Sequence, residues 1–399
     1  MVKIVARREF LRRSSLACAS LLPLACLPEP LRACEATGTQ EIQGSQPPGV
    51  SEDSNYISLR NLPPVHVENH RELRTVVGLR PYRPSGFVVR AEKLDDTLVI
   101  HNYGHGGAGI TLSWGTAQLA LQLGCNGHAG PVAVIGSGAV GLATACLLQE
   151  AGFDVTIYTQ ALPLETTSNI AGGEWRPFLI ADPEKSDAHF NRQLLSASDF
   201  AYKRFQSMLG SRFGIRRITS YSVSKHAFAT PIRVGVECGG DGGEPVVREL
   251  KPDQTPFPKG SSVRQSETLL IEPPAYLPAM MDAFLQAAGK VVIRKIEDRG
   301  AVAQLQEKLV FNCTGMGAKE IFGDDELTPV RGQLTFLKPQ PEVGYALSHD
   351  ELYMLPRTDG ILLGGTYELG VHSIAPNMQK KQEILARHKA FFDSYRRIS

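Results

Sequence analysis

The chain has no run of 18 or more consecutive apolar residues in its 399 residues, so we expect no transmembrane helix. It has almost no net charge, because 42 Lys and Arg stand against 41 Asp and Glu, and this balance argues against a nucleic-acid partner. None of its seven cysteines stands in a CxxC pair, so we expect neither a metal site nor a disulfide framework. The remaining composition, 42% hydrophobic and 21% charged, is typical of a globular protein with one large or two medium cores.

Residues 1–36 have the pattern of an export signal rather than of a folded element. Arg7 and Arg8 form a twin-arginine pair, and the apolar stretch Leu16–Leu27 that follows is too short to span a bilayer. We therefore expect a Tat export signal and a location in the periplasm or outside the cell. Two alternatives stay open. One is a basic amphipathic first helix, which the prolines of this stretch disfavour, and the other is a lipoprotein anchor at Cys26.

A glycine-rich turn follows a short apolar strand in the middle of the chain. The stretch Pro131–Ile135 predicts a buried strand, and Gly136, Gly138 and Gly141 come directly after it as GxGxxG. The first glycine permits a tight turn, the second lets a pyrophosphate approach the backbone, and the third lets the next helix pack on the strand. The N-terminus of that helix offers unpaired N–H groups to phosphate. The turn therefore predicts a dinucleotide site, against the alternative of a tight turn that binds nothing.

The second expected strand, Val155–Tyr158, lacks the acidic residue that usually follows it in NAD-binding proteins. Thr159 and Gln160 stand there instead, and Gln160 can exchange hydrogen bonds with a ribose but adds no charge. The strand therefore gives NAD little support. A second glycine-rich stretch, residues 104–111, offers backbone N–H groups and close approach of a ligand rather than side-chain chemistry.

Several stretches together resemble the D-amino-acid oxidase family. They are residues 78–84 (GLRPYRP), 101–111 (HNYGHGGAGIT), 166–177 (TTSNIAGGEWRP), 312–315 (NCTG), 353–356 (YMLP) and 364–367 (GGTY). The resemblance covers roughly residues 72–396. It implies an α/β fold, with a Rossmann-like FAD-binding domain and a second α+β substrate domain built on a mostly antiparallel sheet.

By this resemblance the chain divides into four parts after the signal. Residues 37–71 are a polar linker, 72–123 complete both domains, 130–210 form the FAD-binding domain, and 211–396 form the substrate domain together with returning strands of the first domain. In the family the Arg-Pro strand and the glycine loop come last, whereas here they come first. We therefore expect a circular permutation, which is feasible because the termini of a compact domain often lie close together. The alternative is a misassembled or fused gene.

The resemblance implies FAD as the cofactor and assigns the residues that contact it. From the dinucleotide-binding part these are Gly136, Ser137, Gly138, Ala139, Val140, Gly141, Gln160, Thr166, Thr167, Ser168, Gly173, Glu174, Trp175, Ile296 and Thr314, and from the glycine loop they are Gly106, Gly107, Gly109, Ile110 and Thr111. Loop amides aimed at the N1–C2 edge of the flavin would stabilise the negative charge of its reduced form.

The resemblance also implies a small amino-acid substrate, with O2 as the electron acceptor. Arg80 is the implied carboxylate clamp, because a guanidinium grips a carboxylate with two parallel hydrogen bonds. Tyr353 is the implied second contact to that carboxylate, and the carbonyl of Gly107 is the implied partner of the amine. The implied reaction is hydride transfer from the α-carbon to flavin N5, which yields a 2-oxo acid, ammonia and hydrogen peroxide. His105 is expected to brace its loop rather than to act as a base.

Three residues bear on which substrate side chain the site accepts, and they leave that question undecided. His349 stands where the family has a second tyrosine, and Arg176 and Arg357 each add a positive charge. If either arginine faces the pocket, an acidic side chain such as that of D-aspartate is favoured. Three other functions stay open: a flavin amine oxidase acting on glycine or N-substituted amino acids, an NAD-dependent dehydrogenase, and a non-catalytic exported flavin-binding protein. The sequence predicts no particular oligomeric state.

Overall fold

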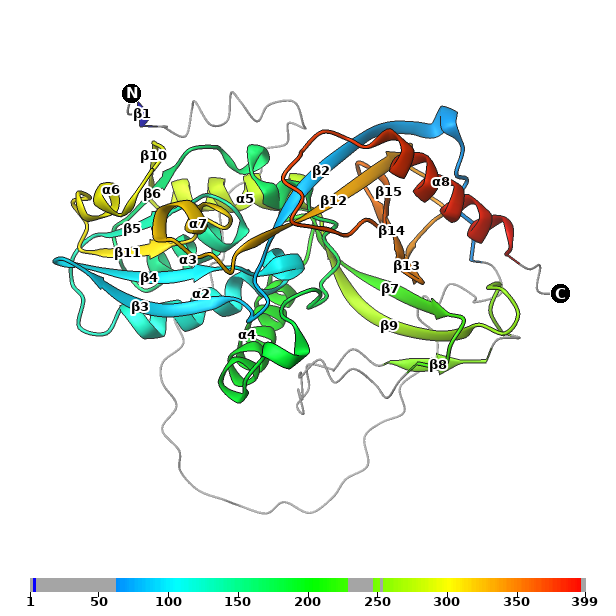
Figure 1. Ribbon diagram of the computed structural model, residues 1–399, viewed down its shortest axis with the longest axis horizontal. Helices are drawn as coiled ribbons and strands as arrows, with labels where there is room; N and C mark the ends of the chain where they lie inside the picture. The colour runs from blue at the N-terminus through cyan, green and yellow to red at the C-terminus, as the bar shows by residue number, and fades with distance from the viewer. Residues whose placement is uncertain (1–2, 5–61, 229–246, 252–253, 396–399) are drawn as a thin grey trace, which may run out of the picture.

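Two β-sheets form the body of the molecule in the computed structural model (Figure 1). The structure describes residues 3–4, 62–228, 247–251 and 254–395. Most of the expected export signal and of the expected linker therefore lies outside the described residues. Within the signal, Lys3–Ile4 form a short strand, β1, that pairs with the edge of the first sheet. Within the linker, Leu62, Val65 and Val67 are buried in the second core, so the fold begins ten residues earlier than the predicted boundary.

The first sheet has seven strands and a parallel centre. Its order is β1, β10 (Lys290–Ile293), β6 (Val155–Thr159), β5 (Val132–Ile135), β11 (Leu309–Asn312), β4 (Thr97–Tyr103) and β3 (Val88–Leu94). The pairs from β10 to β4 are parallel, and β3 joins β4 as an antiparallel hairpin. Strands buried on both faces read as continuous apolar runs, and all four residues of β5 are buried.

Helices cover both faces of the first sheet. On one face Ile100, Val134 and Ile157 pack against α2 (Gly109–Gly124), α3 (Ala139–Glu150) and α5 (Pro273–Gln286). On the other face Val99 and Val310 pack against α6 (Arg299–Ala303) and α7 (Gly317–Phe322). This three-layer arrangement is that of a Rossmann-like domain.

The second sheet has nine strands and is antiparallel except for the pair β13–β7. Its order is β16 (Glu368–Leu369), β12 (Thr328–Leu337), β15 (Gly360–Gly364), β14 (Leu352–Arg357), β13 (Tyr345–His349), β7 (Ile215–Ser224), β9 (Ser262–Ile271) and β8 (Arg248–Leu250), with β2 (Glu72–Tyr82) paired to β12. The predicted fold class is confirmed: an α/β chain with a Rossmann-like domain and a second domain on a mostly antiparallel sheet.

Two long helices complete the fold. The sequence pattern did not reveal α4 (Ala188–Ser207), which begins where the Asp187 side chain accepts the Phe190 N–H and which packs so closely on α2 that a Cβ on Gly115 would overlap the Ala197 carbonyl. The expected terminal helix is α8 (Met378–Asp393), which contributes to the core of the second sheet. The 3-10 turns are η2 (Asn69–Arg71), η3 (Gly106–Ala108), η4 (Pro163–Glu165), η5 (Thr167–Ile170) and η6 (Pro183–Lys185).

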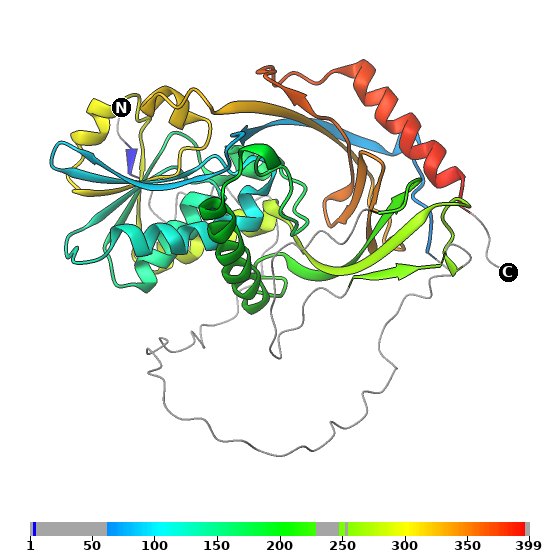
Figure 2. The ribbon, with the colours of Figure 1, turned by 60° about the horizontal axis from the view of Figure 1, so that its bottom comes forward.

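The early segment, residues 62–124, contributes to both domains. It supplies β3, β4 and α2 to the first and β2 to the second, and β2 and β12 run side by side between them (Figure 2). Residues near the first and last positions of the described range 62–395 both contact the hydroxyl of Tyr345. The Tyr345 hydroxyl lies 2.8 Å from the Pro63 carbonyl oxygen, to which it donates, and 3.0 Å from the Tyr395 hydroxyl. Among the described residues, none of the helices is long and apolar enough to cross a bilayer.

Candidate functional site

A cavity of about 1240 Å³ lies between the two domains and is lined by both. Its walls come from the Arg-Pro strand (78–81), the glycine loop from Asn102 to Thr111, the dinucleotide turn (135–140), residues 313–317 at the end of β11, and 350–353 of the second sheet. The cavity is therefore shared by residues that lie far apart in the sequence, among them Arg80, Gly107, Gly136 and Tyr353. In the described part of the chain, no cluster of three or more His, Cys, Asp or Glu side chains is placed to hold a metal ion.

The dinucleotide turn has the geometry that a pyrophosphate requires. Gly136 has φ +108°, and a Cβ there would lie 2.6 Å from the Cys313 carbonyl oxygen, so only glycine fits this turn. Gly138 is the N-cap of α3 and provides no side chain, which leaves the helix N-terminus open to the cavity. The N–H of Ala139 donates to the Ser168 hydroxyl at 3.0 Å, so a predicted cofactor residue already braces this turn. A cradle without side chains at a helix N-terminus fits the diphosphate of FAD.

The glycine loop is held rigidly by neighbouring backbone. Gly106 has φ +55°, and a Cβ there would overlap the Leu179 carbonyl oxygen, while the Gly107 N–H donates to that same oxygen at 3.1 Å. His105 is fully buried, hydrogen-bonds Thr116 at 2.8 Å through Nε2, and stacks on Phe87. Burial lowers the pKa of His105 to about 3, so the ring is neutral. The geometry thus gives His105 the bracing role.

Arg80 and Tyr353 lie on one face of the second sheet. The Arg80 guanidinium rests on Gly332 of β12, where a Cβ would lie 2.5 Å from its terminal nitrogens. Across β15, the Tyr353 ring covers Gly364 in the same way, and Gly172 lies over the other side of the ring. The two glycine positions of the sheet leave room for these side chains to lie flat below the cavity. In the part of the chain that the structure describes, the Arg80 guanidinium has no hydrogen-bond or ion-pair partner, so it is free to bind a ligand carboxylate.

The structure separates the two added arginines. Arg357 is 1% exposed at its side chain, pairs with Asp359 at 2.8 Å and donates to the Ala171 carbonyl, and it does not line the cavity. The condition under which Arg357 would favour an acidic substrate is therefore not met, because a nearby carboxylate neutralises its charge and holds it away from the cavity. Arg176 does line the cavity.

His349 faces away from the cavity. Its ring stacks on Phe391 of α8 at 3.7 Å, and Nε2 lies 3.4 Å from Nδ1 of His388. Because side chains alternate along a strand, Ser348 rather than His349 lines the cavity beside Tyr353. Burial lowers the pKa of His349 to about 4, and this histidine supports α8 rather than a lid over the substrate.

Most of the predicted cofactor residues line the cavity. These are Gly136, Ser137, Gly138, Ala139, Val140, Gln160, Thr166, Thr167, Ser168, Gly173, Glu174, Ile296, Thr314, Gly106, Gly107, Gly109, Ile110 and Thr111. Two do not. The Trp175 ring packs on Tyr202 with 4.7 Å between centroids, and the backbone N–H of Trp175 donates to the Leu269 carbonyl oxygen. Gly141 serves helix packing, since a Cβ there would overlap the Gly136 carbonyl oxygen.

The sequence interpretation missed a relay that orients Thr314. The buried His101 lies between Glu92, 2.9 Å from Nε2, and the Asn312 amide nitrogen, 3.0 Å from Nδ1. Asn312 in turn accepts the Thr314 hydroxyl at 2.7 Å. Because the Asn312 oxygen is used by Thr314, its nitrogen donates to Nδ1, which places the His101 proton on Nε2. Burial lowers the pKa of His101, although the neighbouring Glu92 acts to raise it. Through His101 and Asn312, the early segment holds Thr314 in place on the cavity wall.

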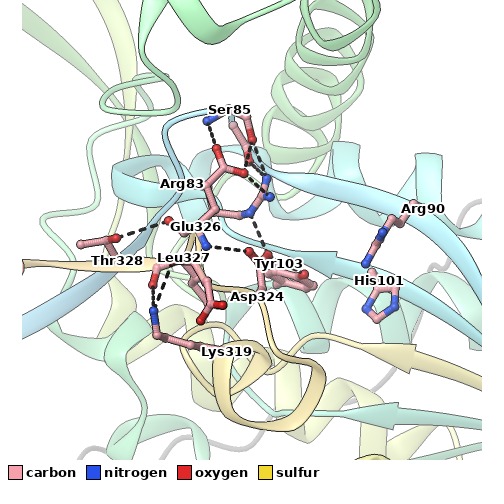
Figure 3. A network of polar contacts seen from close by, with 12 residues as sticks. Arg83, Ser85, Arg90, His101, Tyr103, Lys319, Asp324, Glu326, Leu327 and Thr328 are labelled. Atoms are coloured by element: carbon pink, nitrogen blue, oxygen red, sulfur yellow. Dashed lines mark hydrogen bonds and ion pairs between the residues drawn. The ribbon is translucent and has the colours of Figure 1, made fainter.

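A second missed cluster fastens the early segment to the loop between α7 and β12 (Figure 3). Arg83 donates from Nε to Asp324 at 2.8 Å and from a terminal nitrogen to Glu326 at 2.5 Å. The Tyr103 hydroxyl donates to Asp324 at 2.7 Å, and Ser85 donates to Glu326. Burial opposes ionisation of Asp324, but the bonds from Tyr103 and Arg83 outweigh it and lower the pKa of this carboxyl.

Replacing Arg83 with Met should lower the free energy of unfolding by about 2 kcal/mol, because two partly buried carboxylates lose charged donors. Denaturant unfolding monitored by circular dichroism measures the change. Lys389→Met is the matched control, since its pair with Asp393 is exposed and should contribute less than about 0.5 kcal/mol. Equal losses in the two variants would show that the Arg83 cluster is no more than a surface contact.

Comparison with known proteins places the chain in a family. Residues 131–399 match the family described as DAO, FAD dependent oxidoreductase. The chain belongs to this family. FAD is its cofactor, as predicted, and the NAD-dependent dehydrogenase alternative is removed. Similar proteins include a D-amino-acid oxidase from Streptomyces coelicolor, 28% identical over 270 residues (65% of this chain, 76% of that protein), and a human D-aspartate oxidase, 26% identical over 263 residues (64% and 74%).

Two solved structures that superimpose on part of the chain are oxidases. A glycine oxidase from Bacillus cereus superimposes with a TM-score of 0.48 at 14% identity, covering 65% of this chain and 77% of that one. An iminodiacetate oxidase from Chelativorans superimposes with the same TM-score of 0.48 at 16% identity, covering 66% and 79%.

Proposed function

We propose that this chain oxidises a D-amino acid to the corresponding 2-oxo acid, with release of ammonia and hydrogen peroxide. The observation that carries the proposal is the Arg80 guanidinium, which lacks a protein partner among the described residues and lies on the same cavity as the dinucleotide turn. Bound FAD supplies the hydride acceptor and passes two electrons to O2. The imino acid that is left takes up water and releases ammonia. Relatives named D-amino-acid oxidase and D-aspartate oxidase support the substrate class.

In this proposal, the chain's own residues bind and orient the substrate. Arg80 grips the carboxylate with two parallel hydrogen bonds, and the Tyr353 hydroxyl gives it a further donor. Since the Gly107 N–H is already used by Leu179, the group that Gly107 offers to the substrate amine is its carbonyl. The Ile170, Leu334 and Leu355 side chains form an apolar wall on the cavity and exclude water from the reacting carbon. No side-chain base is needed if the amine enters neutral.

Anaerobic bleaching of the flavin tests this function. D-alanine, D-aspartate, L-alanine, glycine and sarcosine are mixed with the purified yellow protein, and the loss of oxidised-flavin absorbance is followed in time. Faster bleaching by D-alanine or D-aspartate than by the other three supports the proposal. D-aspartate ahead of D-alanine would favour a role for Arg176, the added arginine that lines the cavity. Glycine or sarcosine as the fastest substrate would establish an amine oxidase of the alternative kind, and no bleaching by any amino acid would leave a non-catalytic flavin-binding protein.

We also propose that the order of segments is circularly permuted. The support is that Pro63 and Tyr395 both contact the Tyr345 hydroxyl, so the end of α8 lies beside the start of the early segment. At the other junction, the short connector 125–131 leads from the end of α2 to the start of β5. Both junctions suit a chain in which the early segment once followed α8.

Export through the Tat pathway is a separate proposal that the sequence of residues 1–36 supports. Cell fractionation tests it with the full chain and with a variant in which Arg7 and Arg8 are both replaced by Lys. Loss of the exported fraction in the variant supports the proposal, and an unchanged distribution contradicts it.

A further inference from the structure

Asn102 is a buried polar residue on the cavity wall, and the sequence motifs assign it no role. It lies near the end of β4, its residue exposure is 0%, and it lines the cavity directly before the glycine loop. A buried amide is ordinarily hydrogen-bonded at both of its ends. Among the described residues, only one end of the amide has a partner.

The orientation of this amide is fixed by Thr144 of α3. The Thr144 hydroxyl donates its single proton to the Val140 carbonyl oxygen at 2.8 Å. It can therefore only accept from its other neighbours, which are the Asn102 amide nitrogen at 3.3 Å and the Cys313 thiol at 3.6 Å. The amide nitrogen of Asn102 must face Thr144, and a flipped amide would set two acceptors against each other.

The other end of the amide, Oδ1, is left without a partner. It is buried, and no described residue donates to it. An unsatisfied buried acceptor is costly, so a donor from outside the chain is expected at this point of the cavity. In this respect Asn102 differs from three hydroxyl residues of the wall, Ser137, Thr159 and Ser168, each of which already has a protein partner.

We infer that Asn102 Oδ1 accepts a hydrogen bond from a hydroxyl of the ribityl chain of FAD. Cys313 contacts both Thr144 and Gly136, which places the Asn102–Thr144 pair beside the turn that fits the pyrophosphate. On its other side, Asn102 leads within two residues to the loop 104–111, which is expected to hold the flavin ring. The part of FAD that joins pyrophosphate to ring is the ribityl chain, and its hydroxyls are the donors that an isolated carbonyl oxygen can use.

This role rests on FAD binding and not on the identity of the substrate. Asn102 belongs to the early segment, whereas the pyrophosphate turn belongs to the family-matched part of the chain. The contact therefore gives the early segment a direct share in holding the cofactor.

The test compares FAD with three analogues, each lacking one of the three ribityl hydroxyls. Dissociation constants are measured by flavin fluorescence for the wild-type apoprotein and for Asn102→Leu. The wild-type should bind one analogue roughly fivefold to tenfold more weakly than FAD, the effect of one lost hydrogen bond. Asn102→Leu should bind FAD about as weakly as the wild-type binds that analogue, and it should no longer distinguish the two.

Thr144→Val separates direct contact from general damage to the wall. It removes the partner of the amide nitrogen but keeps Oδ1, so this variant should still distinguish FAD from the same analogue. Thermal unfolding of each apoprotein reports whether the substitutions disturb the fold. If Asn102→Leu weakens FAD and all three analogues by the same factor, Asn102 supports the wall only, and the inference is overturned. Unchanged FAD affinity in Asn102→Leu would overturn it as well.

Discussion

Replacing Arg80 with Leu should raise the KM for the amino acid by roughly 30-fold to 800-fold, while FAD stays bound. The loss of a bidentate charged contact costs roughly 2–4 kcal/mol, and each 1.4 kcal/mol is about a factor of ten. The side chain rests on Gly332 of the second sheet, so its removal leaves the dinucleotide turn intact. Steady-state peroxide release gives KM and kcat, and flavin fluorescence gives the dissociation constant of FAD.

Two further variants sharpen this result. Arg80→Lys keeps the charge but not the planar pair of donors, and its KM should fall between those of the wild-type and Arg80→Leu. Arg74→Leu is the matched control, because Arg74 lies on the same strand and pairs with Asp359 away from the cavity. An Arg80→Leu enzyme with wild-type kinetics would remove Arg80 from the substrate site.

A reordered chain, with residues 131–399 followed by a flexible linker and residues 62–124, should fold and bind FAD with near-wild-type affinity. The fragment 131–399 alone should not fold, although it is the part that matches the family. Without the early segment, β11 loses its parallel neighbour β4, and β12 loses β2 along ten residues. The first sheet would then expose Phe311 and Val310, which are fully buried in the complete chain.

Circular dichroism and the ratio of bound flavin to protein measure this outcome. Coexpression of 62–124 with the fragment 131–399 is the control for chain order, since the same contacts can form without a covalent link. A fragment 131–399 that binds FAD normally on its own would make the early segment dispensable. A reordered chain that fails to fold, when the original order folds, would contradict the permuted arrangement.

Local patterns predicted those elements whose residues specify their own conformation. The run 131–141 combines an apolar strand with glycines at the required spacing, and the structure places a strand, a φ +108° turn and a helix there. Helix α5 shows where such reasoning fails. A proline inside a helix lacks an N–H donor and by local rules predicts a break, yet α5 begins at Pro273 and continues through Pro278, because the packing of its apolar face outweighs the lost hydrogen bond.

Side-chain direction was the part that local patterns did not give. Arg176 lies in one motif stretch and Arg357 directly follows another, yet Asp359 holds Arg357 in the sheet, whereas Arg176 lines the cavity. His349 and Ser348 are adjacent, and strand register alone decides that the serine lines the cavity. Trp175 was expected at the cofactor, but Tyr202 of α4, a helix absent from the sequence prediction, holds its ring elsewhere.

The sequence by itself determined the dinucleotide turn and the glycine loop, because each depends on residue types at short spacing, and the resemblance singled out Arg80. Only the tertiary structure decided that these pieces share one cavity. That outcome depends on β4 pairing with β11 and β2 with β12, contacts between positions more than 200 residues apart. It also decided that the Asn102 side-chain oxygen has no partner among the described residues, since hydrogen bonding depends on all the neighbours that the fold brings around an atom.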